Sequence, residues 1–322
     1  MKKILLTNKY DKEPYQIIQS AVPEFFELLM LEEISQKELE KKALQADYIL
    51  ASGRLKINKQ VLDCAKNLKM IQRTGVGLDS LDLAEIKTRN IPVYVNYGVN
   101  AESVAEHAVL LMLACLRKLT VVNQNTKNGI WQKQAQGIRT RELRTQTVGI
   151  IGMGNIGRHT VKRLNAFGAN ILYYSRHRLD EKSEAELQAA YTGLDELLEK
   201  SDIISLHCPL TEETSGLICK TSIEKMKDGV IIINTARGPL IKENDLITGL
   251  QCGKIGFAGI DVFEKEPTDN TALLTLDNVI VTPHIGGITY DSFYNMMHDA
   301  MRNIELFETG NLQDIQKYKL EL

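Results

Sequence analysis

Short apolar runs alternate with helix-like stretches along the whole chain. In the first third, the apolar runs cover residues 3–7, 24–30, 48–51, 68–73 and 92–96. Between them lie patterns of helical period, such as residues 35–43, where Ser35 can cap a helix and Glu38 completes a capping box. This alternation is typical of a mostly parallel sheet with helices on both faces.

A second series of the same kind starts at residue 147. Its strand candidates are residues 147–151, 170–174, 202–206, 230–235, 256–260 and 278–281. Before it come a long helix pattern at residues 101–119 and a polar stretch at 123–145, and after it comes a helix pattern at 288–308. The first of these helices is apolar around much of its circumference, as in helices that join domains or lie in a subunit interface. We therefore predict two doubly wound α/β domains.

Composition narrows the class of protein. With 322 residues the chain is too long for one ordinary core. Hydrophobic residues make up 43% and charged residues 25%, which excludes disordered and fibrous classes. The net charge is −2 without blocks of like charge, so neither a nucleic acid nor a membrane surface is an expected partner. Five scattered cysteines without CxxC spacing indicate free thiols and no metal site. No signal peptide is recognised. We expect a cytoplasmic enzyme.

The glycine-rich segment at residues 152–157, here named the glycine loop, carries the clearest chemical signal. It follows a strand candidate, opens a helix pattern at 156–167, and has the spacing GxGxxG. Gly152 allows a tight turn, Gly154 lets the backbone approach a pyrophosphate, and Gly157 lets the helix pack closely on the strand. A plain glycine-rich turn is the alternative, but the strand, helix and next strand favour a dinucleotide site with the phosphates at the helix N-terminus.

The residues after the next strand bear on which dinucleotide is bound. An acidic side chain here would bond the ribose hydroxyls of NAD. This chain has Ser175, Arg176, His177 and Arg178 instead. A hydroxyl and guanidinium groups would hold a 2′-phosphate by charge-assisted hydrogen bonds, so the turn favours NADP over NAD. The alternative is a solvated basic turn near Asp180.

Polar side chains end the remaining strands of the second series. In chain order they are His207, Arg237, Asp261 with Glu264 and Glu266 after it, and His284. Parallel strands bring these groups to the same edge as the glycine loop. Reducing a 2-oxo acid needs a cation to hold the substrate and a proton donor of near-neutral pKa, which arginine and histidine supply. A nearby carboxylate would orient the imidazole.

The six histidines are not equally suited to donate a proton. His107, His159 and His298 fall inside helix patterns, where packing or surface positions are the more frequent roles. His207 ends a strand and can serve only to cap backbone groups. His284 is the best candidate because Pro283 stiffens its approach and glycines follow it. The residues alone leave this choice open.

Several motifs in order along the chain resemble those of the D-isomer-specific 2-hydroxyacid dehydrogenase family. They are RTGVGLD at 73–79, NAESVAEH at 100–107, the glycine loop, HCPLT at 207–211, NTARG at 234–238, DVFEKEP at 261–267 and TPHIGG at 282–287. The resemblance covers essentially the whole chain and implies a Rossmann dinucleotide-binding domain at 99–287. It also implies a discontinuous flavodoxin-like substrate domain at 1–98 and 288–322, with the active site in the cleft between them.

The same resemblance implies roles for individual residues. It makes Arg237, Glu266 and His284 the catalytic trio, with His284 as proton donor, Glu266 as its partner and Arg237 as substrate ligand. Substrate contacts fall to Val76, Gly77, Arg237 and His284, with backbone N–H groups of the 75–77 loop facing the substrate carboxylate. Cofactor contacts fall to Gly152, Met153, Gly154, Asn155, Ile156, Gly157, Ser175, Arg176, His177, Cys208, Thr235, Ala236, Asp261 and Gly286. Asp261 would hold the nicotinamide carboxamide. A homodimer is expected, with the 101–119 helix in its contact.

Two departures from the family pattern guide the choice of function. Tyr97-Gly98 replaces a frequent Pro-Gly turn, and Ser175-Arg176 replaces the aspartate of NAD-dependent relatives. The second departure resembles the NADPH-preferring glyoxylate and hydroxypyruvate reductase branch. We expect reduction of such a small 2-oxo acid to the D-2-hydroxy acid. The alternatives are an NAD-dependent enzyme of the phosphoglycerate dehydrogenase type and a corepressor-like nucleotide sensor, which would not need the intact trio. A formate dehydrogenase would pair its histidine with glutamine.

Overall fold

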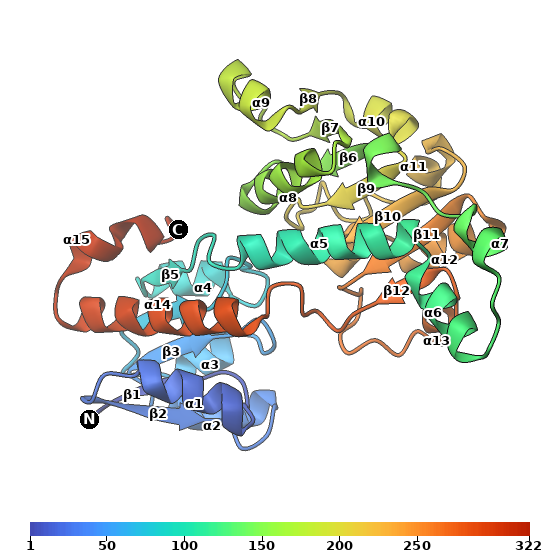
Figure 1. The fold of residues 1–322 in the computed structure, drawn as a ribbon. Coiled ribbons are helices and arrows are strands. Elements are labelled where there is room, and N and C mark those ends of the chain that lie inside the picture. The colour runs from blue at the N-terminus through green and yellow to red at the C-terminus, as the bar shows by residue number, and fades with distance from the viewer. The chain divides into compact units, whose positions relative to one another are not determined.

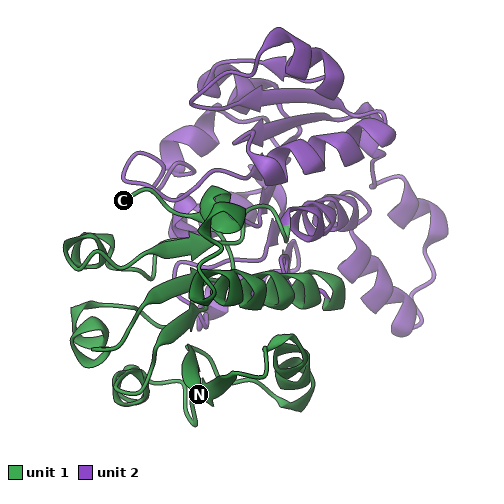
Figure 2. Ribbon diagram, turned by 90° about the vertical axis from the view of Figure 1, so that its left-hand side faces the viewer, with its two compact units in different colours: residues 1–100, 290–322 green, residues 101–289 purple.

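The computed structural model describes residues 1–322 and divides the chain into two compact units (Figure 2). Unit 1 comprises Met1–Asn100 and Tyr290–Leu322, and unit 2 comprises Ala101–Thr289. The chain therefore leaves unit 1 once and returns to it for its last helices, coloured red in Figure 1. Neither unit contains a helix with both the length and the apolar character needed to cross a membrane.

Unit 1 is a five-stranded parallel sheet with helices on both faces. Its strand order is β2-β1-β3-β4-β5, the flavodoxin-like order. The strands are β1 (Lys2–Leu6), β2 (Phe26–Met30), β3 (Tyr48–Ala51), β4 (Met70–Arg73) and β5 (Val93–Val95), and the helices are α1 (Lys12–Ala21), α2 (Gln36–Ala43), α3 (Lys59–Cys64), α4 (Leu83–Thr88), α14 (Tyr290–Glu308) and α15 (Leu312–Ile315). Successive residues of β1 face opposite layers: Leu5 belongs to one core, and Ile4 and Leu6 belong to the core that α14 covers.

Unit 2 is a seven-stranded parallel sheet in the order β12-β11-β10-β9-β6-β7-β8, which contains the Rossmann order of two mononucleotide halves. The strands are β6 (Thr147–Ile151), β7 (Asn170–Tyr174), β8 (Ala190–Tyr191), β9 (Ile203–Leu206), β10 (Val230–Asn234), β11 (Ile255–Ile260) and β12 (Val279–Val281). The helices are α5 (Ala101–Leu116), α6 (Leu119–Lys127), α7 (Lys133–Gly137), α8 (Asn155–Ala166), α9 (Glu181–Leu187), α10 (Leu194–Lys200), α11 (Lys220–Lys225), α12 (Glu243–Cys252) and α13 (Thr271–Leu274). The switch point lies between β6 and β9, where the strand order reverses.

The predicted class, two doubly wound parallel sheets, is confirmed, and most strand boundaries agree within two residues. The predicted helix at residues 101–119 is wrong at its end. α5 stops at Leu116, Lys118 adopts a left-handed φ of 50°, and α6 begins at Leu119. The polar stretch at 123–145 then contains the end of α6, all of α7 and a 3-10 turn at Leu143–Thr145.

Helix α5 is buried along most of its length, as its apolar pattern predicts. Ala105, Ala108 and Met112 are fully buried, and the helix packs on α8 and on β10, β11 and β12. The polar residues Ser103 and His107 lie on this helix too, and both are partly buried. An apolar helix that touches three strands of the sheet is a firm support for the loops after those strands.

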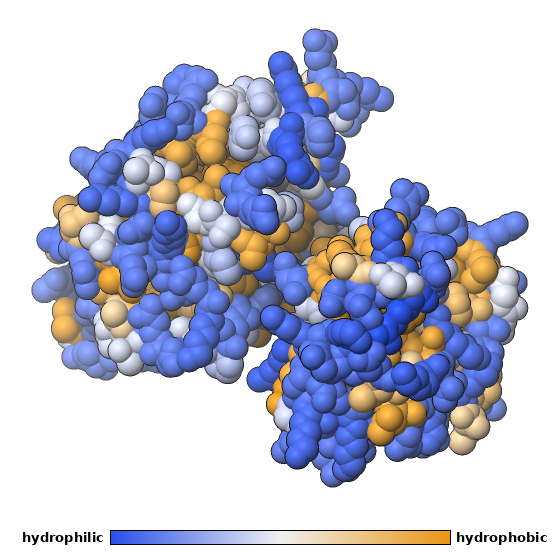
Figure 3. Space-filling model, turned by 180° about the vertical axis from the view of Figure 1, so that it is seen from behind, coloured by the Kyte–Doolittle hydropathy of each residue, from blue (hydrophilic) through white to orange (hydrophobic).

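Hydrophilic side chains cover most of the molecular face in Figure 3, where hydrophobic ones form smaller patches.

Candidate active site

The glycine loop is shaped by close backbone contacts. Gly152 has a φ of 102°, and a Cβ at this residue would lie 2.6 Å from the backbone N of Cys208. A Cβ at Gly157 would lie 2.2 Å from the carbonyl oxygen of Gly152. Gly154 differs, because a Cβ there would meet nothing within 4 Å. Gly152 and Gly157 are therefore required by the fold itself, whereas Gly154 leaves space open at the N-terminus of α8.

The turn after β7, residues 175–178, contains two guanidinium groups in different surroundings. Arg178 donates from Nε and Nη2 to the Glu184 carboxylate, at 2.9 Å each, and lies over the Tyr191 ring. Hydrogen bonds from Arg178 and then from Tyr173 lower the pKa of Glu184 to about 2. The Arg176 side chain is 70% exposed, and its Nη1 lies 3.9 Å from the Glu213 carboxylate. Arg178 thus braces the turn, and the Arg176 side chain remains largely exposed to solvent.

His207 and Cys208 follow β9 and pack against the glycine loop. His207 Nε2 lies 2.9 Å from the Ser205 hydroxyl, and burial lowers the pKa of this histidine to about 4. Burial also raises the pKa of the Cys208 thiol to about 11. Both side chains are therefore uncharged near neutral pH. At that pH His207 is not an imidazolium that could act as an acid catalyst, and Cys208 is not a nucleophilic thiolate.

The turn after β10 carries Arg237. The Asn234 side chain shapes it, because Nδ2 donates to the Arg237 carbonyl at 2.9 Å and Oδ1 accepts from the Ala236 N–H at 3.0 Å. Gly238 follows, and a Cβ there would lie 1.9 Å from the Phe263 carbonyl carbon. Only glycine fits this contact, which brings the Arg237 turn against the loop after β11.

The loop after β11 brings Glu266 to His284. His284 Nδ1 lies 2.8 Å from Glu266 Oε2, and Glu266 Oε1 accepts from the Phe263 N–H at 3.1 Å. Burial raises the pKa of Glu266, but the hydrogen bond and charge of His284, the Phe263 N–H and the charge of Arg237 together lower it below its usual value. The carboxylate is therefore ionised at neutral pH and orients the imidazole. The structure thus joins Glu266 and His284 of the predicted trio by a hydrogen bond, and the charge of Arg237 acts on Glu266.

Asp261 ends β11 and lies under the loop at residues 282–286, here named the His284 loop. Its side chain is 1% exposed, accepts from the Thr282 hydroxyl at 2.6 Å, and accepts from the N–H groups of Ile285 and Gly286 at 2.9 and 2.8 Å. Burial raises the pKa of Asp261, but hydrogen bonds from His107, Thr282 and the two amides lower it overall. The carboxylate is ionised and holds the loop in place.

Sequence reasoning missed His107, which it assigned to packing or the surface. His107 Nε2 lies 2.9 Å from the Thr282 hydroxyl and 3.5 Å from Asp261 Oδ1. One signal in the sequence was available: Ser103 and His107 are four residues apart, on one face of a largely apolar helix. For His159 and His298 the structure agrees with the sequence reasoning. His159 lies 3.9 Å from Glu102, and His298 stacks on Tyr294.

In unit 1, the loop at residues 75–77 follows β4. Arg73, the last residue of β4, donates from Nη1 to the carbonyl oxygens of Ala51 and Ser52 at 3.1 and 2.7 Å. The Val76 side chain is 43% exposed, so the loop reaches the surface of its unit. Tyr97 is also exposed, and Gly98 after it has a φ of 79°, a conformation that favours glycine.

The residues of unit 2 fit a dinucleotide. The space above Gly154 admits an anion to the N–H groups at the start of α8, a twelve-residue helix. Thr235 Oγ1, after β10, is buried without a hydrogen-bond partner, which is the condition of a group that awaits a ligand. Together with the strand order, these features place a nucleotide site at the carboxyl edge of the sheet.

Comparison with known proteins agrees with this geometry. The family model described as "D-isomer specific 2-hydroxyacid dehydrogenase, NAD binding domain" matches residues 109–286. A hydroxypyruvate reductase from Thermotoga maritima is 42% identical over 293 residues, 90% of this chain and 93% of that protein. A D-3-phosphoglycerate dehydrogenase from Archaeoglobus fulgidus is 40% identical over 265 residues, 82% of this chain and 50% of that protein. A glyoxylate reductase from Thermococcus litoralis is 37% identical over 277 residues, 84% of this chain and 83% of that protein.

A solved structure resembles the chain over nearly its full length. The D-lactate dehydrogenase from Aquifex aeolicus, complexed with NAD and lactic acid, has a TM-score of 0.89 and 31% identity, and 99% of each chain is covered. The family model, the relatives and this structure identify the cofactor as a nicotinamide dinucleotide. The chain belongs to the D-isomer specific 2-hydroxyacid dehydrogenase family and is an oxidoreductase that acts on 2-hydroxy acids.

Proposed function

We propose that the chain reduces a small 2-oxo acid of the glyoxylate or hydroxypyruvate kind to the D-2-hydroxy acid. The hydrogen bond between His284 Nδ1 and Glu266 Oε2 carries this proposal, because it leaves the other ring nitrogen of His284 to serve a substrate. Relatives named hydroxypyruvate reductase and glyoxylate reductase support the choice of substrate class.

In the proposed mechanism, His284 gives its Nε2 proton to the carbonyl oxygen of the substrate as that oxygen gains negative charge. Ionised Glu266 holds the ring through Nδ1–H and stabilises the imidazolium before the transfer. The Arg237 guanidinium binds the substrate and polarises its carbonyl. The nicotinamide, when bound, supplies the hydride that reaches the carbonyl carbon. One hydride and one proton convert the 2-oxo acid to the 2-hydroxy acid.

We propose that unit 1 is the substrate domain and that its loop at residues 75–77 binds the substrate carboxylate. Successive backbone N–H groups at Val76 and Gly77 suit an anion. The residue that precedes this loop region, Arg73, is fixed by hydrogen bonds to Ala51 and Ser52. Substitution of Gly77 by proline removes one N–H and should raise the KM for every 2-oxo acid alike.

We propose that the enzyme prefers NADPH, with Ser175, Arg176 and His177 around the 2′-phosphate. The exposed guanidinium group of Arg176 supports this preference. Position 175 is a serine, and a carboxylate there would repel the 2′-phosphate. Met153, Asn155, Ile156, Cys208, Ala236 and Gly286 complete the proposed cofactor contacts, and Asp261 is proposed to hold the nicotinamide carboxamide through its remaining acceptor capacity.

One set of assays tests the substrate and the cofactor together. Nicotinamide absorbance is followed with glyoxylate, hydroxypyruvate, phosphohydroxypyruvate and pyruvate, each with NADH and with NADPH. We expect the highest kcat/KM for glyoxylate or hydroxypyruvate with NADPH. A preference for phosphohydroxypyruvate would favour the second candidate, a phosphoglycerate dehydrogenase, which the relative from Archaeoglobus fulgidus supports. A preference for NADH would refute the proposal that the 175–178 turn binds the 2′-phosphate of NADPH.

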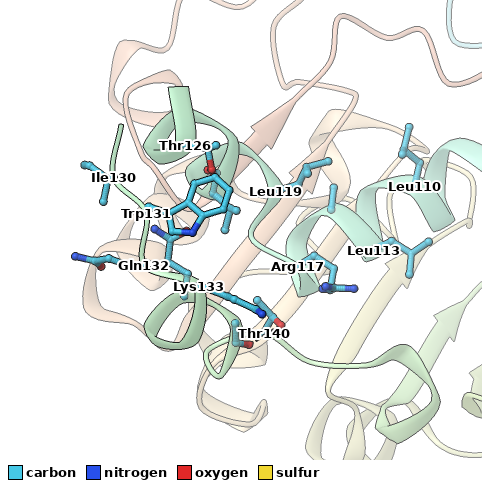
Figure 4. Close-up of a pocket in the computed structure, with 14 residues that line it drawn as sticks. Leu110, Leu113, Arg117, Leu119, Thr126, Ile130, Trp131, Gln132, Lys133 and Thr140 are labelled. Atoms are coloured by element: carbon cyan, nitrogen blue, oxygen red, sulfur yellow. Dashed lines mark hydrogen bonds between the residues drawn. The ribbon is translucent and has the colours of Figure 1, made fainter. Parts of the chain in front are cut away.

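We also propose that the protein is a homodimer that pairs through a hollow of about 530 Å³ beside α5. Side chains of α5 line one side, and those of residues 126–140 line the other (Figure 4). Of the residues that line it, Trp131 is 81% exposed, Ile130 is 42% exposed, and Leu110 and Leu119 are more than half exposed. An apolar surface of this kind favours a self-complementary contact between two copies.

Light scattering after size-exclusion chromatography measures the mass of the protein in solution, and we expect the mass of a dimer. Changing Trp131 and Ile130 together to serine should give a monomer, whereas Phe25→Ser, at another exposed apolar residue, should leave the dimer intact. Trp131 is the only tryptophan, so its fluorescence should also shift to longer wavelength on dilution. A wild type that is monomeric at every concentration would refute the proposal.

The expected cytoplasmic location is also a proposal. All five cysteines are free thiols, which fits a reducing compartment.

A further inference from the structure

We propose that Ser103 and His107 on α5 are positioning residues that hold the His284 loop in its productive conformation. This inference rests on the proposed role of His284 as proton donor. Their hydrogen bonds go to Gly286 and Thr282 and not to the His284 ring, so each acts through the loop that carries it.

The two side chains contact opposite ends of the His284 loop. Ser103 Oγ donates to the carbonyl oxygen of Gly286 at 2.9 Å, at the end of the loop. His107 Nε2 lies 2.9 Å from Thr282 Oγ1, at its beginning. Because the two residues are four apart on a buried helix, one rigid face supports both ends.

The contacts define the direction in which the protons are donated. The Asp261 carboxylate is ionised, so it can only accept, and the Thr282 hydroxyl must donate its single proton to Oδ1 at 2.6 Å. The hydroxyl oxygen is then left to accept from His107 Nε2. His107 therefore carries a proton on Nε2. The result is one chain of donors from α5 through Thr282 to Asp261, which in turn holds the amides of Ile285 and Gly286.

Polar contacts, and not apolar burial, hold the loop. Ile285, the large apolar residue of the loop, is 42% exposed, so its burial does not secure the loop. At the same time His284 has a φ of 55°, a left-handed conformation that a non-glycine residue keeps only when its surroundings impose it. The polar chain supplies that constraint. When the chain is broken, we expect His284 to relax and its ring to leave Glu266.

His107 can be replaced without removing the helix that carries it. α5 is held by fully buried apolar residues, including Ala105, Ala108 and Met112, none of which contributes to the polar chain. The His107 side chain is 12% exposed, at the edge of the buried layer. Substitution should therefore change the loop more than it changes stability.

The experiment compares two variants of the same residue in the holoenzyme. His107→Phe removes the N–H donor, while His107→Gln keeps an amide N–H at the same distance from the backbone. We expect His107→Phe to lose up to about a hundredfold in kcat, because a misplacement of about 1 Å in a catalytic group can cost that much. The Kd of the reduced cofactor should stay near wild type. The solvent deuterium isotope effect on kcat should rise in His107→Phe, and His107→Gln should recover most of the activity.

A double-mutant cycle tests whether His107 acts on kcat through the Thr282 hydroxyl. In the Thr282→Val background, His107→Phe should cost little more, because the chain is already broken at the hydroxyl. His159→Phe is the matched control, since it removes another partly exposed histidine of unit 2 that lies outside the chain, and it should keep full activity. Ser103→Ala should give a smaller loss in kcat than His107→Phe.

Three results would overturn the inference: wild-type kcat in His107→Phe, equal losses in the Phe and Gln variants, or full additivity with Thr282→Val. NMR of the six histidine rings gives a readout without turnover, with the His284 signal assigned by its loss in His284→Gln. That signal should move in His107→Phe and return in His107→Gln. If the wild type reduces no 2-oxo acid, the proposed function fails, and the NMR comparison still decides whether α5 positions the loop.

Discussion

Replacing Gly154 by alanine should separate cofactor binding from folding. Gly154 is the N-cap of α8 and has φ −77° and ψ −161°, backbone angles that any residue adopts. A Cβ at this residue meets no atom of the protein within 4 Å. The added methyl group therefore enters only the space through which, in a GxGxxG loop, the backbone approaches a pyrophosphate.

The effects on folding and on binding differ in size. Alanine restricts the unfolded chain, which is stabilising, but it is a poorer N-cap than glycine, so the free energy of unfolding should change by less than about 0.5 kcal/mol. Binding should lose a charge-assisted hydrogen bond between backbone N–H and phosphate, worth about 1.5–3 kcal/mol. At about 1.4 kcal/mol per tenfold, the Kd for NADH and NADPH should rise roughly 10- to 100-fold.

Cofactor fluorescence titration measures the Kd, and urea unfolding measures the stability. Gly193→Ala is the matched control, because Gly193 is also a helix N-cap, with φ −66° and ψ 155°, and its Cβ would also meet nothing within 4 Å. It should bind cofactor normally. Gly157→Ala is the opposite case and should fail to fold, since its Cβ would lie 2.2 Å from the Gly152 oxygen. Wild-type affinity in Gly154→Ala would refute the pyrophosphate site.

Four more predictions concern the catalytic trio and the cofactor turn. His284→Ala should abolish turnover with cofactor affinity kept, and full activity in that variant would remove the proton-donor role. Arg237→Lys should raise the KM for the 2-oxo acid, since an ammonium group cannot reproduce a planar fork, and an unchanged KM would contradict this. Arg176→Ala should raise the Kd of NADPH about tenfold or more and leave NADH unaffected, whereas Arg178→Ala should mainly lower the Tm. The folded-state pKa of Glu266 lies below its usual 4.5, so the stability from this group is complete above pH 4.5 and is lost as the pH falls through the folded-state pKa. The difference in urea unfolding between wild type and Glu266→Gln should therefore shrink as the pH falls below 4.5.

Local signals in the sequence predicted the fold well where glycine or a clear period marks an element. The strands at 147–151 and 170–174 agree to the residue, and Ser35 caps α2 as expected. The predicted capping box is wrong in its second half, because the Ser35 N–H donates to the Glu33 carbonyl and not to the Glu38 side chain. The end of α5 could not be predicted from such local signals. Lys118 takes the left-handed conformation although no glycine, asparagine or proline marks the break, so the helical pattern continues across it. Strand β8 has only two residues, too few for a periodic signal.

The sequence predicted which residues belong to the candidate site better than it predicted how those residues contact one another. The strand ends indicated Arg237, Glu266 and His284, but the hydrogen bond between the last two depends on the path of the loop after β11. The contact between His107 and Thr282 joins residues 175 positions apart, and nothing local to either residue announces it. Such contacts follow from how a helix packs over strand ends, which is tertiary structure.

The register of the sheet explains how groups so far apart in sequence reach one site. Main-chain hydrogen bonds continue past the strands into the loops: the Asp261 N–H donates to the Asn234 carbonyl at 2.9 Å, and the Thr282 N–H donates to the Ile260 carbonyl at 3.0 Å. The His284 N–H then donates to the Asp261 carbonyl at 2.8 Å. Each loop is therefore held by the strand beside it. A shift of one residue in the pairing of β11 with β10 would turn every side chain of β11 to the opposite face and separate His284 from Glu266. The geometry of the site is in this sense a property of the parallel sheet, and α5 adjusts only the last loop.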